Sequence, residues 1–230
     1  VRVVPNKYPA VHARAEHAVH GLAARGVHEL VIESDVHDDD LITYDDAQLL
    51  RLFRVLRDRV RALESTPSVE HVAVFRNRGK RAGASQPHPH AQLVGMHVPG
   101  REQVTRLETA LRFHARTGGN LGADIVRRER AQGERIVADE AGMVSLTAFA
   151  PRRTREAWVM PDRAIGSLAA FDDETLAAFA RAIQVLTRGL LEVSGRTDYN
   201  VTLRTLPVAY RDHPAAFTYA EVIPRGGAVA

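Results

Sequence analysis

Cysteine is absent from the 230-residue sequence, lysine occurs only at positions 7 and 80, and no long apolar run is present. Without cysteine, neither a disulfide nor a thiolate metal ligand can form within these residues. This composition fits a cytoplasmic protein, and no secretory signal is visible. No run approaches the roughly 18 apolar residues that a membrane-spanning helix needs, so we expect no membrane segment.

Positive charge is in slight excess, with a formal net charge of +3, and arginine carries nearly all of it. No basic run is interleaved with aromatic residues, which argues against a nucleic-acid-binding groove. The densest basic cluster, RNRGKR at 76–81, stands just before a histidine-rich segment. Two interpretations of this cluster remain open: a solvated loop, or a surface that attracts an anionic substrate.

The chain contains two similar series of predicted elements. Each series has an apolar, β-branched strand, an acidic turn, a long amphipathic helix and further strands. The predicted helices are 47–65 in the first series and 174–193 in the second. The predicted strands are 28–34, 71–77 and 90–98 in the first series and 155–161, 198–205 and 216–224 in the second.

The two series match in order and spacing, with a period of about 127–130 residues, which indicates an internal duplication. Tyr44-Asp45-Asp46 in the first series matches Phe171-Asp172-Asp173 in the second, and these aspartates are placed to cap the two helices. We therefore predict an α+β protein with two related halves, residues 1–115 and 116–230. Each half is expected to have an antiparallel sheet and one long helix.

The segment SQPHPHAQL, residues 85–93, carries His88, His90 and Gln92 at alternate positions. Alternate residues of a strand face the same side, and Pro87 and Pro89 favour an extended chain. We therefore predict that both imidazoles and the amide face one pocket. The repeat aligns these three positions with Thr218, Ala220 and Val222 of the second half, which suggests that the fold does not require histidine there.

Three interpretations of the histidine pair are open: a nucleophile with its support, a metal pair, and a structural turn. A neutral imidazole can attack phosphorus when its other ring nitrogen is held as N–H. Gln92 could then donate to phosphoryl oxygens without acting as a base. The residues upstream favour this first interpretation, because glycines allow close approach of a phosphate to the backbone and polar side chains can donate to it. They are Asn77, Gly79, Gly83 and Ser85.

The segment FRNRGKRAGASQPHPHAQL, residues 75–93, resembles the galactose-1-phosphate uridylyltransferase family of the histidine-triad superfamily. VRVVPNKYPAV (1–11), GVHELVIESDVH (26–37), REAWVMP (155–161) and DYNVTLRTLP (198–207) are similar to further segments of that family. The resemblance implies a duplicated histidine-triad-like fold in which the first half carries the active motif and the second a degenerate one. It also implies a homodimer.

The resemblance assigns roles to individual residues. It implies that His90 is the nucleophile that accepts a nucleoside monophosphate, with Gln92 beside it as the second catalytic residue. The substrate-binding residues would be Asn6, Asn77, Gly83 and Ser85. His37 and His88 would be zinc ligands, whose usual Cys-x-x-Cys partners are not in this chain, so the expected zinc site is incomplete. A second metal is not expected, because the matching positions are Arg204, Thr218 and Ala220.

The leading hypothesis is transfer of UMP from UDP-glucose to galactose 1-phosphate through a covalent nucleotidyl-histidine intermediate. The partners would then be a nucleotide sugar and a sugar phosphate, with neither nucleic acid nor membrane involved. The main alternative keeps the chemistry but uses phosphate as the acceptor, as a nucleotide-sugar or dinucleoside tetraphosphate phosphorylase does. A different class, a nucleotide-binding protein without catalysis, is disfavoured by the joint presence of His88, His90 and Gln92.

Overall fold

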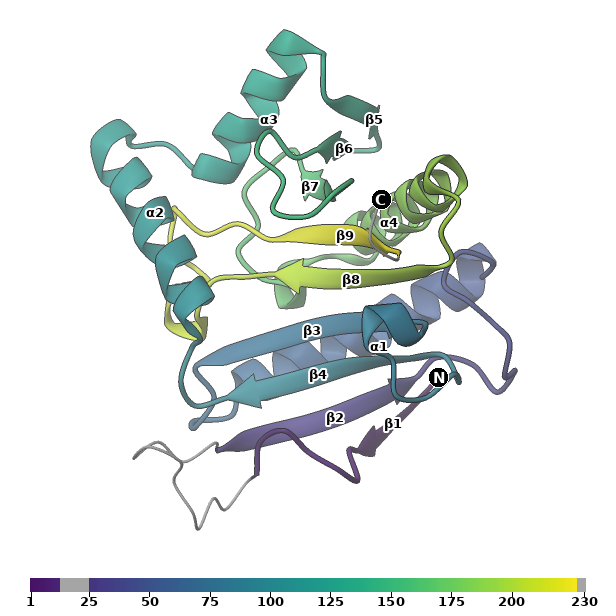
Figure 1. The fold of residues 1–230 in the computed structure, drawn as a ribbon. Coiled ribbons are helices and arrows are strands. Elements are labelled where there is room, and N and C mark those ends of the chain that lie inside the picture. Colours follow the sequence, from purple (N-terminus) through teal and green to yellow (C-terminus); the bar gives the residue numbers. More distant parts are fainter. Residues whose placement is uncertain (13–24, 227–230) are drawn as a thin grey trace.

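One nine-stranded antiparallel sheet forms the framework of the protein (Figure 1). The computed structural model describes residues 1–12 and 25–226. The strands are β1 (Arg2–Pro5), β2 (Gly26–Ile32), β3 (His71–Arg78), β4 (His90–Met96), β5 (Ile136–Glu140), β6 (Met143–Thr147), β7 (Ala157–Pro161), β8 (Asp198–Arg204) and β9 (Tyr219–Arg225). The helices are α1 (Asp46–Glu64), α2 (Arg101–Thr117), α3 (Leu121–Gln132) and α4 (Asp173–Ser194), with short 3-10 turns η1 (Lys80–Ala82), η2 (Leu168–Ala170) and η3 (Val208–Tyr210). None of the described helices is long and apolar enough to cross a bilayer.

The predicted α+β class is confirmed, and the two long helices begin where the paired aspartates predict. Asp45 caps α1 by accepting from the backbone N–H of Gln48 at 2.7 Å. Asp172 caps α4 by accepting from the backbone N–H of Thr175 at 2.7 Å. A carboxylate there satisfies free N–H groups and interacts favourably with the helix dipole.

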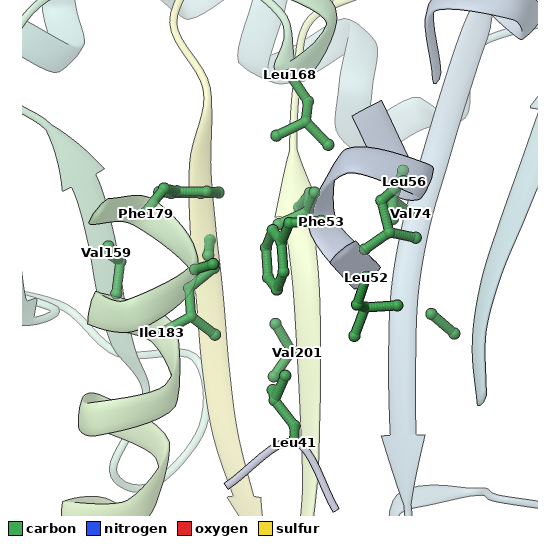
Figure 2. Close-up of a cluster of buried hydrophobic side chains, with 14 of the residues drawn as sticks. Leu41, Leu52, Phe53, Leu56, Val74, Val159, Leu168, Phe179, Ile183 and Val201 are labelled. Carbon is green, nitrogen blue, oxygen red and sulfur yellow. The ribbon is translucent and has the colours of Figure 1, made fainter. Parts of the chain in front are cut away.

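The main hydrophobic core lies between the sheet and the helices α1 and α4 (Figure 2). Phe53 of α1 meets Phe179 of α4 edge to face, with ring centroids 6.4 Å apart. Val74 of β3 and Val201 of β8 supply part of the floor beneath them. The apolar stripe that predicted each helix is thus the stripe that is buried.

The strand order is the same when read outward from the central β3–β8 pair: β3, β4, β2, β1 on one side and β8, β9, β7, β6 on the other. A duplication would produce this order, and both groups belong to one continuous sheet. The duplication itself stays a prediction. The predicted boundary between residues 115 and 116 falls inside α2.

No element was predicted between residues 99 and 154, where the structure has α2, α3, β5 and β6. The long helix α2 buries only one residue, Ala110. Val104, Leu107 and Leu111 nevertheless recur at helical spacing, a signal in the sequence that the prediction overlooked.

The predicted alignment of His90 and Gln92 with Ala220 and Val222 is wrong. Ala220 and Val222 belong to the core beneath α4. In β4, the residues that alternate with His90 and Gln92 belong to that core, so His90 and Gln92 face the opposite side of the sheet.

Strand registers show which residue of the second half matches Gln92. Gln92 pairs with Phe75, Phe75 with Thr202, and Thr202 with Glu221. These four residues form one row across the sheet, and Glu221 stands where Gln92 stands in the first half. The second half still lacks a histidine beside this position, because the residue two before Glu221 is Tyr219.

A buried ion pair lies on the helix side of the sheet. Arg76 of β3 donates from Nε to both carboxylate oxygens of Glu33, at 2.9 and 3.1 Å, and Glu33 is fully buried. Arg76 also donates to the Tyr199 hydroxyl at 2.8 Å and lies 3.2 Å from Asp40. Burial, together with the Glu33 carboxylate, raises the pKa of Tyr44, whose hydroxyl donates to Glu33 at 3.0 Å. The cluster joins the segment after β2 to β3 and β8.

Replacing Arg76 by methionine should lower the free energy of unfolding by about 3–5 kcal/mol, because Glu33 would remain buried without its partner. Urea unfolding measures this loss. Arg54→Met is the matched control, since Arg54 and Asp173 form a 2.6 Å pair whose side chains are about half exposed. We expect at most about 1 kcal/mol there. Equal losses in the two variants would contradict the assigned role of the buried pair.

His71 gives stability a pH dependence. Burial lowers the pKa of this side chain to about 4, whereas the unfolded chain has the ordinary value of 6.5. Because the unfolded state binds the proton more readily, stability should fall as the pH drops from about 6.5 toward 4, by up to roughly 3 kcal/mol. In His71→Gln this component should be missing from the pH profile of the unfolding free energy. Identical profiles would show that His71 does not contribute.

Candidate active site

The predicted catalytic residues lie on the sheet face opposite α1 and α4, at the start of β4. His90 is the first residue of the strand and Gln92 the third, so both face this side. His88 precedes the strand, and its ring lies instead beside the segment after β2, with Nε2 2.9 Å from the backbone oxygen of Ser34. The prediction that His88, His90 and Gln92 all line one strand face is therefore wrong for His88.

The protonation of His90 is defined by one contact. Its Nδ1 lies 2.8 Å from the backbone oxygen of His88. A carbonyl oxygen can only accept, so Nδ1 carries the hydrogen and Nε2 keeps its lone pair. His90 is 7% exposed, so its ring is held by surrounding atoms. This arrangement meets the first requirement for an imidazole nucleophile.

Gln92 is held by His28, a residue that the sequence analysis did not identify. The Gln92 Oε1 lies 2.9 Å from His28 Nε2, and the backbone N–H of Ala10 donates to His28 Nδ1 at 3.0 Å. Asn6, a predicted substrate-binding residue, has its amide nitrogen 3.1 Å from the same Nε2, and its Oδ1 accepts from Tyr8 N–H at 2.9 Å. The structure thus joins Asn6 and Gln92 through His28. The sequence gives no signal for this role, because His28 meets Gln92 only once β2 pairs with β4 and Leu30 becomes the partner of Gln92.

Asn77 and Gly83 lie together at the end of β3. A Cβ built on Gly83 would lie 3.9 Å from the Asn77 amide nitrogen, and Gly83 has φ +83°, which favours glycine. The Oδ1 of Asn77 accepts from the side chain of Asn200 at 2.7 Å, a second residue that the sequence analysis missed. The side chain of Asp198 accepts from Arg81 N–H at 2.8 Å and so holds η1, the turn before Gly83.

Ser85 follows this turn and is exposed. It lies in the irregular segment between η1 and β4. Its predicted contact with a phosphoryl group needs no rearrangement of the core, because the hydroxyl is on the surface.

The predicted zinc ligands His37 and His88 are neighbours. Their Nδ1 atoms are 3.3 Å apart, which matches two corners of a tetrahedral zinc site with bonds of about 2.0–2.1 Å. The Ser34 carbonyl bonded to His88 Nε2 would leave Nδ1 free to ligate. Among residues 1–12 and 25–226, however, no three His, Cys, Asp or Glu side chains gather as a metal site. Two ligands fit zinc, and a complete site does not form from the described part of the chain.

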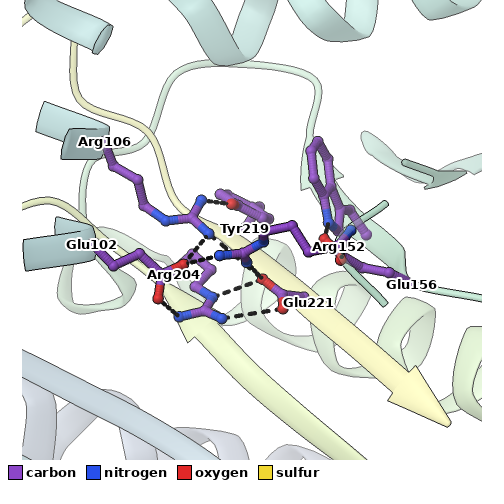
Figure 3. A network of polar contacts seen from close by, with 8 residues as sticks. Glu102, Arg106, Arg152, Glu156, Arg204, Tyr219 and Glu221 are labelled. Atoms are coloured by element: carbon purple, nitrogen blue, oxygen red, sulfur yellow. Dashed lines mark hydrogen bonds and ion pairs between the residues drawn. The ribbon is translucent and has the colours of Figure 1, made fainter. Parts of the chain in front are cut away.

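The same sheet face carries a different polar cluster in the second half (Figure 3). Glu221, 1% exposed, accepts from Arg204 at 2.8 and 3.1 Å and from Arg152 at 3.0 Å. Burial alone would raise the pKa of Glu102, but hydrogen bonds from Arg106 and Arg152 lower this pKa to about 2. The carboxylates here are paired with guanidinium groups of the protein itself.

The positions considered for a second metal lie in or beside this cluster. Arg204 pairs with Glu221 and approaches Glu102 at 3.4 Å. Thr218 is buried, and Ala220 is part of the core.

Comparison with known proteins gives three relevant similarities. Residues 20–98 match the N-terminal domain of the DUF4931 family, a domain of unknown function. ADP-glucose phosphorylase of Arabidopsis thaliana is 23% identical over 98% of this chain and 66% of its own length. Galactose-1-phosphate uridylyltransferase of Thermotoga maritima is 28% identical over 71% of this chain and 51% of its own length. The chain therefore spans about half to two thirds of these relatives.

Two solved structures have a similar fold. The crystal structure of the Arabidopsis ADP-glucose phosphorylase with bound ADP-glucose superimposes with a TM-score of 0.88 at 22% identity, covering all of this chain and 73% of the other. A uridylyltransferase structure superimposes with a TM-score of 0.89 at 24% identity, covering 97% of this chain and 72% of the other. These likenesses confirm the predicted α+β fold, and the duplication within it stays a prediction.

The neighbouring rings of His37 and His88 should bind Zn²⁺ loosely in this 230-residue chain, because two nitrogen ligands are half of a structural site. Titration with Zn²⁺, followed by NMR, should shift the ring signals of these two histidines. The shift should be lost in His37→Ala, and dialysis should remove the metal. One zinc ion per chain that survives dialysis would contradict this expectation and require further ligands.

Proposed function

Because the chain is a relative of the galactose-1-phosphate uridylyltransferase family within the histidine-triad superfamily, we propose that it transfers a nucleoside monophosphate from a nucleotide sugar through His90. The observation that carries the proposal is the 2.8 Å contact between His90 Nδ1 and the His88 carbonyl. It leaves the Nε2 lone pair available for attack and offers an acceptor for the N–H as positive charge develops on the ring.

The reaction has two displacement steps. Nε2 of His90 attacks the α-phosphorus, a P–N bond forms, and the P–O bond to the sugar phosphate breaks with its electron pair leaving on that oxygen. An acceptor phosphate oxygen then attacks the same phosphorus, and His90 leaves as a neutral imidazole. The proton on Nδ1 stays in place throughout, so this mechanism needs no separate base for His90.

Four groups are proposed to bind the substrate around this phosphorus. The amide nitrogens of Gln92 and Asn77 would donate to its oxygens, together with the Ser85 hydroxyl and the exposed backbone near Gly83. None of these groups is a base at neutral pH, which favours transfer to the acceptor over hydrolysis. Asn6 is proposed to hold the nucleoside.

Two acceptors are supported by different relatives. The Thermotoga relative is named for uridylyl transfer to galactose 1-phosphate, which supports the UDP-glucose reaction. The Arabidopsis relative is a phosphorylase and aligns with 98% of this chain, which supports phosphate as acceptor and ADP-glucose as donor. Both reactions share the first step at His90.

Incubation with UDP-glucose or ADP-glucose labelled at the α-phosphorus should label the protein covalently. The label should be absent from His90→Ala, because the proposed P–N bond forms at Nε2 of His90. His97→Ala is the matched control, since this histidine directly follows β4 and its Nδ1 lies 2.9 Å from the Arg25 carbonyl. No label on the wild type with either donor, or equal label on His90→Ala, would exclude the proposed intermediate.

The acceptor can be identified by discharging the isolated, labelled protein. Galactose 1-phosphate should release labelled nucleotide sugar if the chain is a uridylyltransferase. Inorganic phosphate should release a labelled nucleoside diphosphate if it is a phosphorylase. Release by neither acceptor at rates above that of water would leave a protein that binds a nucleotide covalently without transferring it, and would contradict both reactions.

A further inference from the structure

Two side-chain amides stand at the proposed reaction centre, and each has a donor end and an acceptor end. Only the NH₂ end of Gln92 or Asn77 can donate to a phosphoryl oxygen. The opposite orientation would direct a carbonyl oxygen at a negatively charged group. Catalysis by these residues therefore depends on which way each amide is turned.

The orientation of Gln92 follows from His28. The backbone N–H of Ala10 can only donate, so Nδ1 of His28, 3.0 Å away, is an acceptor without hydrogen. In a neutral ring, Nε2 then carries the hydrogen and donates to Gln92 Oε1 at 2.9 Å. The Asn6 amide nitrogen lies 3.1 Å from Nε2 and 3.4 Å from Nδ1, and because it is itself a donor it can share only Nδ1 as an acceptor. His28 is only 8% exposed, so water competes poorly for this bond. The carbonyl end of Gln92 is occupied, and its NH₂ end is left for the substrate.

The orientation of Asn77 follows from Asn200 in the same manner. The guanidinium of Arg225 can only donate, and its Nε contacts Asn200 Oδ1. The NH₂ end of Asn200 therefore faces the other way, and it donates to Asn77 Oδ1 at 2.7 Å and to the Ala82 carbonyl at 2.8 Å. Asn77 is left with its NH₂ end directed toward Gly83.

We propose that His28 and Asn200 are positioning residues that turn the Gln92 and Asn77 amides so that both present N–H groups to the transferred phosphoryl group. This inference rests on the proposed function of the site. The two chains of hydrogen bonds are separate, one running from β2 to β4 and the other from β9 through β8 to β3. Each begins at a group that can act only as a donor, which gives each chain a single direction.

The test is a pair of double-mutant cycles on the rate of covalent labelling at saturating nucleotide sugar. His28→Phe and Asn200→Ala should each slow labelling about 10- to 100-fold, the loss expected for one hydrogen bond to a charged group. His28→Phe should have no further effect in a Gln92→Ala background, and Asn200→Ala none in Asn77→Ala. In the variant that combines His28→Phe with Asn200→Ala, the two reductions in labelling rate should multiply, because the two series of hydrogen bonds are independent.

A conservative variant separates positioning from packing. In His28→Gln the amide oxygen can accept from Ala10 and its nitrogen can donate to Gln92, so labelling should recover most of the wild-type rate. A slowing by His28→Phe that is equally large with and without Gln92, or that tracks a loss of thermal stability, would overturn the proposal for this residue. Likewise, a slowing by Asn200→Ala that is equally large with and without Asn77 would overturn the proposal for Asn200.

A second measurement distinguishes failure of the inference from failure of the proposed function. Long-range ¹H–¹⁵N NMR reports which ring nitrogen of His28 carries hydrogen, without any turnover. We expect the Nε2–H form in the free protein. An Nδ1–H form would overturn the assigned orientation of Gln92 even if labelling is fast. An unlabelled wild type with the Nε2–H form would instead reject the proposed function and leave the orientation standing.

Discussion

Arg76 and Glu33 lie almost without exposure between the sheet and the helices, and burying two charges is costly unless each is fully hydrogen-bonded. Here Tyr199 and Tyr44 add hydrogen bonds to Arg76 and Glu33, and Asp40 adds an ion-pair contact 3.2 Å from the guanidinium. The cluster matters for the proposed active site because of its neighbours in the chain. Asn77 follows Arg76 directly, and Ser34, which contacts His88, follows Glu33 directly.

The backbone of Glu33 extends this connection to the histidine motif. Its N–H donates to the carbonyl of Pro89 at 3.1 Å, between His88 and His90. The buried side chain thus fixes a backbone group that in turn holds the segment before β4. A charge buried on one face of the sheet determines where the reactive groups stand on the other, which explains why a costly ion pair is placed at this point.

The two halves use the same sheet positions in different ways. Gln92 and Glu221 occupy one row, separated by Phe75 and Thr202, at a distance of about 14 Å for three strand spacings. In the second half, Glu221 is surrounded by arginines that neutralise it. In the first half, the contact that Gln92 makes with the described residues is at its carbonyl end. The first half therefore leaves donors for a ligand, whereas the second uses its charges to join α2 to the sheet.

Much of this arrangement could be predicted from the sequence, for identifiable reasons. Strong periodicity and paired aspartates predicted α1, α4 and the strands next to them, and the predicted resemblance to the galactose-1-phosphate uridylyltransferase family is confirmed. The helix α2 was missed although Val104, Leu107 and Leu111 recur there at helical spacing. The alignment with Ala220 failed because one residue of offset in a strand reverses the face, and sequence spacing alone does not define that offset. His28 and Asn200 were missed because their partners lie on neighbouring strands, so their roles exist only once the strands pair.

One physical principle applies to all three side chains of the proposed reaction centre. His90, Gln92 and Asn77 could each present the wrong atom to a phosphoryl group, through the other tautomer or a turned amide. Each orientation is set by a group with only one hydrogen-bonding role. For His90 it is the His88 carbonyl, for Gln92 the backbone N–H of Ala10 acting through His28, and for Asn77 the Arg225 guanidinium acting through Asn200. These groups cannot reverse their polarity, so the orientation is set before a substrate arrives. Such preorganised donors need no reorientation as charge moves in the transition state, and this is how a site built from neutral side chains can stabilise phosphoryl transfer.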